Sequence, residues 1–434
     1  MGSQPVSYPP QLEIEPVVTA PDATVTLPGS KSITNRALII AALADGKTTL
    51  REALFSDDTR FMQESLNRLG IAVDADEDSS QFTITGASGK IPSTEASMFI
   101  GNSGTSARFL TALAGLGNGT YSIDGVERMR QRPISPLIDA LSQLGVDARS
   151  ETGNGCPPVT IRSNGITGGT VTMAGDTSSQ YFTALLMIGP VTQDGITIDV
   201  EGDLVSKPYL DMTIATMGDF GATVRHENYQ QFTIPGGQSY TARDYSIEPD
   251  ASAASYFFAL AAVTGGRITV ENLGTRSVQG DVEFVDVLEQ MGCRVDRTEQ
   301  QITVTGPEKL SGLTVDMNAI SDTMPTLGAI APLASGPVSI RNVEHVRHKE
   351  TDRISAVAAE LHRTGIEVDE HQDGVTIYPG KPNPAIIETY QDHRMAMSFA
   401  VLGSVVPGIT IDDPGCVAKT FPDFFTRLDQ ALGR

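Results

Sequence analysis

The sequence predicts an α/β protein built from six copies of one small unit, arranged in two groups of three. Three observations support this prediction. A glycine recurs at nearly constant spacing, an apolar helical pattern precedes it, and short segments rich in β-branched residues lie between the helices. The chain of 434 residues also exceeds the size that one hydrophobic core serves, so at least two domains are expected.

The recurring glycine ends a helical pattern and is followed by the start of a strand. It occurs in the segments LNRLGIAV, LSQLGVDA, MGDFGATV, LEQMGCRV and LHRTGIEV. These glycines are Gly70, Gly145, Gly221, Gly292 and Gly365, which are separated by 75, 76, 71 and 73 residues. A near-constant step indicates a duplicated unit.

Each unit begins with an apolar helix that ends at glycine, as in NRALIIAALADG and SSQYFTALLMIG. A strand with alternating β-branched residues follows, for example ITIDVEG or RITVENL. After the second helix come two further strands that look like a hairpin, as in CRVDR with QITVTG. The order within one unit is therefore helix, strand, helix, strand, strand.

The sixth copy begins at DHRMAMSFAVLG, and the chain ends before its hairpin. Two extended segments, QLEIEPV and ATVTLPG, precede the first helix, so we expect the N-terminal strands to complete the last repeat. This expectation divides the chain into one domain of residues 1–29 and 248–434 and another of residues 30–247. The two crossings between them fall near Gly29 and Glu248 and are too short for a flexible tether, which favours a hinge.

Charge and cysteine content exclude several classes of partner and site. A formal net charge of −22 argues against binding to nucleic acid or to an anionic membrane surface. The three cysteines are far apart and lack CxxC spacing, so neither a disulfide framework nor a zinc site is expected. No apolar run reaches the length of a membrane span. We expect a cytoplasmic protein that holds no metal and works as a monomer.

Cations gather at the starts of the predicted helices, where the helix dipole disfavours them. Lys31 and Arg36 open the first helix, and Arg108 and Arg394 lie at equivalent places further along. Other helix-start cations are Arg128, Arg130, Arg132, Lys207, Arg347, Lys349, Arg353 and Lys419. A bound anion reverses the penalty, because the free N–H groups of a helix start bind phosphate or carboxylate. A single cation at a helix start is more often a solvated or ion-paired surface residue, but some ten of them at equivalent positions in so acidic a chain predict an anion site.

Eight segments carry distinctive local motifs, in the order LPGSKSITNRALIIAALADG, GNSGTSARFL, RMRQRPISPLIDAL, SSQYFTALL, SKPYLDMT, KETDRISA, DHRMAMSFAV and AKTFPDFF. Together they resemble the 5-enolpyruvylshikimate-3-phosphate (EPSP) synthase family of enolpyruvyl transferases, from about residue 12 to residue 432. The resemblance implies a two-lobed inside-out α/β barrel of six βαβαββ repeats, three per lobe, with the active site in the cleft between the lobes. It also implies the 3-phosphoshikimate 1-carboxyvinyltransferase reaction with no metal or organic cofactor.

The resemblance further implies roles for individual residues. The residues expected to bind phosphoenolpyruvate are Lys31, Asn102, Gly104, Arg132, Gln180, Arg353, Arg394 and Lys419. Those expected to bind shikimate 3-phosphate are Lys31, Ser32, Arg36, Thr105, Ser178, Ser179, Gln180, Ser206, Tyr209, Asp322, His345 and Lys349. The expected catalytic residues are Lys31, Asp322, Glu350 and His393. Glu350 is the candidate for protonating the methylene of phosphoenolpyruvate, and Asp322 for accepting the hydroxyl proton.

The chain departs from the family pattern at several positions. Phe109 stands where the family usually has proline, and His345 replaces an asparagine expected to touch the shikimate ring. Gly104 is retained, so the space that the inhibitor glyphosate enters is expected to be present, but Phe109 lies on the helix that shapes it. The response to glyphosate is therefore left open.

Two alternative functions fit part of the pattern. A UDP-N-acetylglucosamine enolpyruvyl transferase carries a reactive cysteine on the loop of its second unit, whereas the matching loop here, GVERMRQRP, has none. A non-catalytic repeat protein that binds anionic metabolites would keep the helix-start cations but has no use for Glu350 and Asp322.

Overall fold

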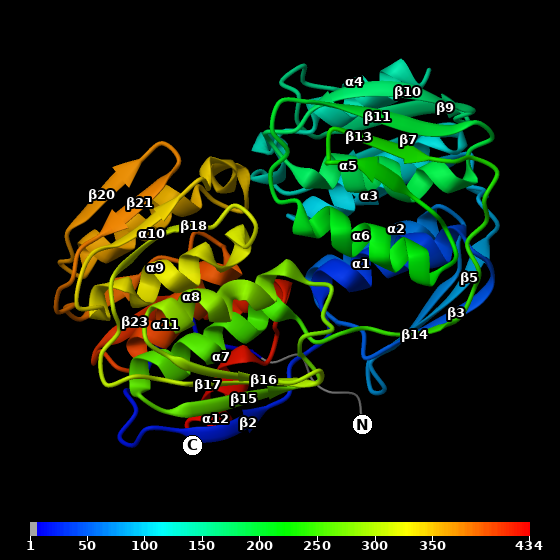
Figure 1. Cartoon of the computed structure of the whole chain (residues 1–434). Coiled ribbons are helices and arrows are strands. Elements are labelled where there is room, and N and C mark those ends of the chain that lie inside the picture. The colour runs from blue at the N-terminus through cyan, green and yellow to red at the C-terminus, as the bar shows by residue number, and fades with distance from the viewer. Residues whose placement is uncertain (1–6) are drawn as a thin grey trace. The chain divides into compact units, whose positions relative to one another are not determined.

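A computed structural model describes residues 7–434. The chain divides into two compact units, one formed by Gly29–Ile247 and the other by residues 7–28 together with 248–434. In Figure 1 the sheets lie toward the outside of each unit, with helices packed between them.

Each unit contains three small sheets, and all six share one topology. The first two strands of a sheet run parallel, the third is antiparallel to the second, and the fourth, where a sheet has one, is antiparallel to the third. The sheets of the first unit are β14(Asp244–Ser246)-β3(Asp45–Arg51)-β5(Gln81–Ala87)-β4(Val73–Asp76), β6(Glu95–Phe99)-β7(Asn118–Asp124)-β9(Val159–Asn164)-β8(Asp147–Ser150) and β10(Gly168–Ala174)-β11(Gly195–Glu201)-β13(Gln231–Ile234)-β12(Arg225–Glu227).

The second unit repeats this topology. Two of its sheets have four strands, and the third has three. They are β2(Asp22–Val25)-β15(Arg267–Glu271)-β17(Gln301–Thr305)-β16(Arg294–Arg297), β18(Leu313–Asp316)-β19(Val338–Arg341)-β21(Gly374–Ile377)-β20(Val368–His371) and β22(Ala385–Ile387)-β23(Ile409–Asp412)-β1(Gln11–Glu13).

The prediction that both N-terminal strands complete the last repeat is correct for β1 and wrong for β2. Strand β1 pairs with β23 of the sixth copy, with Gln11 opposite Asp412. Strand β2 instead pairs in parallel with β15 of the fourth copy, with Asp22 opposite Arg267. The reason is that every sheet needs a parallel first strand, and the fourth copy has none of its own because the preceding strand, β14, completes the sheet of the first copy.

The first helix of each repeat is buried on nearly all sides. These helices are α1(Lys31–Leu43), α3(Gly104–Gly115), α5(Ser179–Ile188), α7(Ala251–Thr264), α9(Met324–Ile330) and α11(His393–Gly403). Every residue of α3 and of α11 is buried. A helix that is apolar all round must lie inside the protein, and within each unit the three first helices contact one another. Polar residues at their starts are therefore buried as well.

The second helices cover the outside of the core and end at the recurring glycine. They are α2(Asp57–Arg68), α4(Ser135–Gln143), α6(Pro208–Asp219), α8(Phe284–Gln290), α10(Arg353–Arg363) and α12(Phe424–Ala431). The six glycines that follow have positive φ angles: +85° at Gly70, +85° at Gly145, +89° at Gly221, +105° at Gly292, +83° at Gly365 and +75° at Gly433. Glycine adopts this left-handed conformation without a Cβ clash, so the predicted helix ends are confirmed.

The described chain shows no sign of a membrane segment or of a metal cluster. Between residues 7 and 434, no helix is both long and apolar enough to cross a bilayer. Within the same range, His, Cys, Asp and Glu side chains do not gather in groups of three or more that could hold a metal ion.

Candidate active site

A buried network of charged side chains lies at the starts of α10 and α11 in the second unit. Arg353 opens α10, and its Nε lies 2.8 Å from Oδ2 of Asp392, the residue that caps α11. The same carboxylate accepts a hydrogen bond from the backbone N–H of Arg394 at 2.9 Å. Asp392 therefore connects the two arginines that the sequence predicts to bind phosphoenolpyruvate.

Asp322 forms the second connection in this network. Its Oδ2 lies 2.7 Å from Nη2 of Arg394, and its Oδ1 lies 3.1 Å from Nη1 of Arg353. Lys349 approaches the same carboxylate at 3.7 Å. Asp322 remains 15% exposed, so of the carboxylates that hold Arg353 it is the one most open to a ligand.

Glu350 lies between two cations of the network. Its Oε2 is 2.8 Å from Nη2 of Arg353, and its Oε1 is 3.8 Å from Nζ of Lys419. Only 7% of its side chain is exposed. The structure therefore brings Glu350, Arg353 and Lys419 together, although Lys419 is far from the other two in sequence.

Burial and charge act in opposite directions on the two arginines. Burial disfavours their charged forms, but the Asp392, Glu350 and Asp322 carboxylates outweigh it and raise the pKa of Arg353. For Arg394, burial is again outweighed, chiefly by Asp322, and its pKa is raised well above the ordinary value. Both guanidinium groups are therefore fixed cations in a site from which water is largely excluded.

The two histidines of this unit that the sequence places in the site differ in their surroundings. His393 is fully buried at the start of α11, with Nδ1 3.4 Å from Oδ1 of Asp392. His345 is also buried, and burial together with the Lys349 cation lowers its pKa to about 3. His345 is therefore a neutral imidazole at pH 7 and can offer a hydrogen bond but no charge.

In the first unit, Lys31 is a buried cation at the start of α1. Ser30 caps the helix by accepting a hydrogen bond from the backbone N–H of Ile33. Lys31 is 9% exposed, and its Nζ lies 3.8 Å from Oδ2 of Asp58, which is also buried. Taken from the sequence, Asp58 looks like an ordinary acid at a helix start, whereas the structure makes it the carboxylate partner of Lys31.

Arg36 is buried one turn further along α1. Its guanidinium donates to the Thr213 hydroxyl at 2.8 Å and to the carbonyls of Ser32 and Tyr209 at 2.8 and 3.1 Å. It also lies over the Phe109 ring, 5.5 Å from the ring centre. Burial lowers the pKa of Arg36 to about 10, so it stays charged at neutral pH.

Arg132 and Gly104 form a tight contact at the start of α3. Nη1 of Arg132 donates to the carbonyl oxygen and to the side-chain oxygen of Asn102, at 2.8 and 3.1 Å. A Cβ placed on Gly104 would lie 2.5 Å from Nη2 of Arg132. Any side chain at position 104 would therefore displace the guanidinium.

The remaining residues predicted to bind shikimate phosphate lie near helix starts of the first unit. Thr105 accepts a hydrogen bond from Nδ2 of Asn35 at 2.8 Å. Ser178 caps α5 by accepting from the backbone N–H of Gln180. Ser179 is buried, and Ser206 is a buried residue with a φ of +56°. Thr105 and Ser178 thus have hydrogen-bond partners within the protein, and the ligand contacts of all four residues stay predictions.

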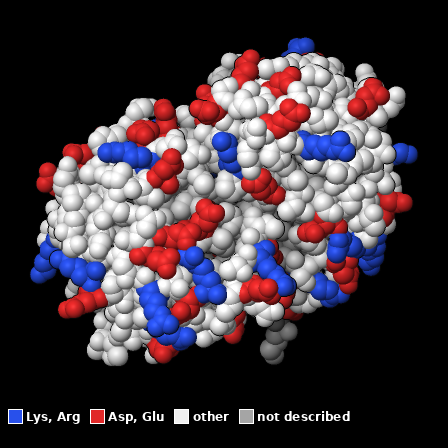
Figure 2. All heavy atoms as spheres, in the orientation of Figure 1, with Lys and Arg blue, Asp and Glu red and all other residues white. Residues whose placement is uncertain are grey.

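Four of the helix-start cations, none of them among the predicted site residues, contact partners other than the charged groups described above. Arg130 is exposed and pairs with Asp124, and Arg128 donates to the side chain of Gln131. Lys207 is exposed and lies over the ring of Tyr229. Arg347 binds Asp352, Glu370 and backbone carbonyls on the side of α10. Figure 2 shows Lys and Arg intermixed with Asp and Glu on the face in view, as expected for ordinary surface pairs.

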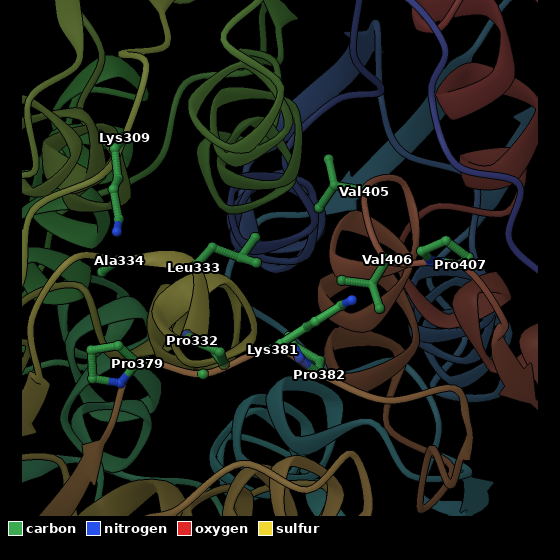
Figure 3. Close-up of a pocket in the computed structure, with 11 residues that line it drawn as sticks. Lys309, Pro332, Leu333, Ala334, Pro379, Lys381, Pro382, Val405, Val406 and Pro407 are labelled. Atoms are coloured by element: carbon green, nitrogen blue, oxygen red, sulfur yellow. The ribbon is translucent and has the colours of Figure 1, made fainter.

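One sizeable pocket lies at the opposite end of the helices in the second unit. Figure 3 shows that its walls come from residues 332–334 after α9, residues 379–382, Lys309, and residues 405–407 after α11. Its volume is about 510 Å³. None of the predicted site residues of this unit lines this pocket.

Comparison with known proteins decides the family. Residues 18–428 match the model of one protein family, described as EPSP synthase (3-phosphoshikimate 1-carboxyvinyltransferase). The chain belongs to the EPSP synthase family. The resemblance that the eight segments indicate is therefore confirmed over nearly the whole chain.

Relatives within the EPSP synthase family are similar over almost their full length. A 3-phosphoshikimate 1-carboxyvinyltransferase of Trichormus variabilis is 53% identical over 413 residues, which cover 95% of this chain and 97% of the relative. A 3-phosphoshikimate 1-carboxyvinyltransferase of Shewanella pealeana is 44% identical over 422 residues, which cover 96% of this chain and 99% of the relative. The EPSP synthase structure from Acinetobacter baumannii superposes with a TM-score of 0.81 at 25% identity, over 97% of this chain and 98% of that one.

An enolpyruvyl transferase structure from Streptomyces tendae matches with a TM-score of 0.74 at 20% identity, covering 97% of each chain. At that identity it shows a shared fold alone. The α/β fold with six small mixed sheets is thus common to EPSP synthase structures and to at least one other enolpyruvyl transferase. The sequence matches, and not the fold, therefore distinguish the EPSP synthase family from the other transferase.

Three buried carboxylates near the predicted cations were not predicted from the sequence. Asp392, Asp58 and Asp281 are buried, yet in the sequence each reads as an ordinary acidic residue at a helix start. Asp281 accepts a hydrogen bond from Ser252 at 2.6 Å near the start of α7, and its charge helps to raise the pKa of Arg394. Burial beside a predicted cation is the distinguishing property, and it depends on the folded structure.

Proposed function

We propose that the chain transfers the carboxyvinyl group of phosphoenolpyruvate to the 5-hydroxyl of shikimate 3-phosphate and releases phosphate. This is a step of the shikimate pathway, which leads to the aromatic amino acids. Membership of the EPSP synthase family, with 53% identity to a relative over 95% of the chain, is the observation that carries the proposal. The buried cations and carboxylates of each unit support it.

Phosphoenolpyruvate is bound by cations from both units in this proposal. Its phosphate and carboxylate together carry about three negative charges, which need several fixed cations in a dry site. Arg353, Arg394 and Lys419 of the second unit meet this requirement, since they lie within one network of ion pairs. From the first unit, Lys31 and Arg132 add charge, and Asn102, Gly104 and Gln180 shape the site.

Shikimate 3-phosphate occupies the helix starts of the first unit and the Asp322 side of the second. Its phosphate is bound by Ser178, Ser179 and Gln180, since helix N–H groups and hydroxyls suit a phosphate. The ring hydroxyls meet Asp322, Lys349 and His345. The remaining contacts come from Lys31, Ser32, Arg36, Thr105, Ser206 and Tyr209.

The reaction proceeds by addition and then elimination. The 5-hydroxyl oxygen attacks C2 of phosphoenolpyruvate, Asp322 accepts the hydroxyl proton, and Glu350 delivers a proton to the methylene carbon. Glu350 then removes a proton from the new methyl group while the bond between C2 and the phosphate oxygen breaks, and Asp322 passes the hydroxyl proton to the departing phosphate. A positioned acid or base contributes about 10²–10⁴-fold to the rate. Lys31 and His393 complete the catalytic set by stabilising the charged intermediate.

The architecture proposed for this chemistry is an inside-out α/β barrel of six βαβαββ repeats, with each unit forming one lobe of three repeats and the substrates lying between the lobes. The shared topology of all six sheets supports this arrangement. Closure of the lobes over the substrates would expel water and strengthen the ion pairs. A fall in the radius of gyration in solution scattering, on adding shikimate 3-phosphate with glyphosate or phosphoenolpyruvate, is the expected sign of closure.

A phosphate-release assay tests the proposed reaction. The protein is incubated with phosphoenolpyruvate and either shikimate 3-phosphate or UDP-N-acetylglucosamine. Release with the first acceptor alone supports the proposal, and release with the second alone would establish the alternative transferase. Lys31→Ala should abolish turnover, because it removes a buried cation. Full activity in that variant would remove Lys31 from the site.

A further inference from the structure

The turn that leads into α11 has an unusual backbone. Tyr390 and Gln391 both have a φ of +54°, the left-handed conformation that residues with a Cβ rarely adopt. Two such residues in succession are strained, and they persist only where their surroundings hold them. The turn ends at Asp392, the residue that contacts both Arg353 and the backbone of Arg394.

A buried carboxylate holds this turn from the side. Glu360 lies in the last turns of α10 and has no exposed surface. Its Oε1 accepts a hydrogen bond from the Tyr390 hydroxyl at 2.7 Å, and its Oε2 accepts from the backbone N–H of Glu388 at 3.1 Å. Arg363 completes the set, with Nε 2.9 Å from Oε2. Glu360 therefore binds both the Tyr390 side chain of the turn and the backbone of Glu388, which precedes it.

Helix α10 and the turn are thus joined at two points. Near its start, α10 contributes Arg353, which is held by Asp392. Two turns later, it contributes Glu360, which holds Tyr390. Both contacts are made by one helix. The contact between Glu360 and Tyr390 therefore holds the turn in the position in which Asp392 can bind Arg353.

The donor in this contact keeps its proton over the working pH range. Burial and the Glu360 carboxylate raise the pKa of Tyr390 to about 12. The hydroxyl is therefore a permanent donor, and the contact does not depend on pH near neutrality.

We infer that Tyr390 and Glu360 are positioning residues for phosphoenolpyruvate: their hydrogen bond holds the strained turn so that Asp392 aims Arg353 and Arg394. The inference rests on the proposed function of these two arginines. According to this inference, neither Tyr390 nor Glu360 contacts the substrate. Their effect is transmitted through the turn to the guanidinium groups.

Tyr390→Phe is the direct test, because it removes one hydroxyl and keeps the ring. Loss of a hydrogen bond to a charged group, transmitted to the arginines, is expected to raise the KM for phosphoenolpyruvate about fivefold or more. The KM for shikimate 3-phosphate and kcat should stay within about twofold of the parent values, because the turn leads to the phosphoenolpyruvate cations. A purely structural role would instead lower thermal stability and leave the two KM values unchanged.

Tyr378→Phe is the matched control. The Tyr378 hydroxyl donates to Oδ2 of Asp369 at 2.8 Å, a contact of the same chemistry in the same unit but on the surface. This variant should show parent kinetics. A second variant relieves the strain: Gln391→Gly permits the left-handed conformation at low cost. Added to Tyr390→Phe, it should recover part of the lost phosphoenolpyruvate affinity.

The outcomes separate this inference from the proposed site. Arg394→Lys is expected to raise the KM for phosphoenolpyruvate about tenfold, because lysine cannot reproduce the planar guanidinium contacts. If Arg394→Lys does so and Tyr390→Phe stays within twofold of the parent, or weakens both substrates equally, the positioning role is overturned. If Arg394→Lys leaves the KM unchanged, the proposed phosphoenolpyruvate site fails and the positioning role fails with it. If adding Gln391→Gly to Tyr390→Phe leaves the affinity for phosphoenolpyruvate as low as in Tyr390→Phe alone, the role of backbone strain is overturned.

Discussion

Arg353 and Asp392 form a bidentate ion pair that solvent hardly reaches. Nε lies 2.8 Å from Oδ2, Nη2 lies 3.3 Å from Oδ1, and the two side chains are 1% and 0% exposed. The pair joins the starts of α10 and α11, which come from the fifth and sixth repeats. Contacts of this kind tie the helix starts of different repeats into one charged network.

Asp392→Asn should destabilise the protein. Removing one partner of a buried ion pair costs about 3–5 kcal/mol, and we expect the lower end because Asp322 and Glu350 still compensate Arg353. Equilibrium unfolding in denaturant measures the loss. Asp124→Asn, which breaks the exposed pair with Arg130, is the control and should cost less than about 1 kcal/mol. Equal, small losses in both variants would contradict the prediction.

Glu350→Gln should lose turnover while it retains substrate binding. The amide keeps the shape of the carboxylate but cannot donate and then remove the proton, so kcat should fall by about 10²–10⁴-fold. Binding of phosphoenolpyruvate in the presence of shikimate 3-phosphate, measured by calorimetry, should change far less. Glu344→Gln, at an exposed residue nearby, serves as control. Unchanged kcat in Glu350→Gln would exclude the acid–base role.

His345→Asn should flatten the dependence of stability on pH. The pKa of His345 is about 3 in the folded protein and about 6.5 when unfolded, so protonation favours the unfolded chain. The stability that the neutral ring contributes is present above about pH 6.5 and is lost as the pH falls toward 3. Between pH 7 and pH 5 the parent should lose about 2 kcal/mol more than the variant. Parallel curves would show that His345 titrates normally.

Phe109→Leu should weaken the packing of Arg36. Phe109 is fully buried, and the Arg36 guanidinium lies over its ring. Loss of ring volume and of the cation–π contact should cost about 2 kcal/mol of unfolding free energy. Phe182→Leu, at a fully buried ring of α5 without a cation above it in the described structure, is the control for volume. A loss no larger than in the control would show that the cation–π contact contributes nothing.

The repeat was predictable because it rests on local rules. A glycine with positive φ ends each second helix, and an apolar helix without a polar face must be buried, so spacing and composition suffice. The partner of β2 was not predictable in this way. Pairing β2 with β15 joins residues that are far apart along the chain, and the sequence of β2 fits either sheet.

The site could be predicted only in part. Family motifs single out Arg353 and Arg394, and the structure places both in one network. Arg347 lies just before Lys349 in the same motif region but binds the outer side of α10, since a short helical turn points neighbouring side chains in different directions. Glu360 gave no signal, because a glutamate late in a surface helix is ordinarily solvated.

The pairing of β1 with β23 has a consequence for the nascent chain. Strand β1 is synthesised long before its partner β23, which ends at Asp412. Residues Gly29–Ile247 contain all three of their sheets within one continuous stretch and can fold while synthesis continues. Strand β1 must therefore stay unpaired until β23 has been made, and β2 until β15 has been made, so both strands present free edges during synthesis.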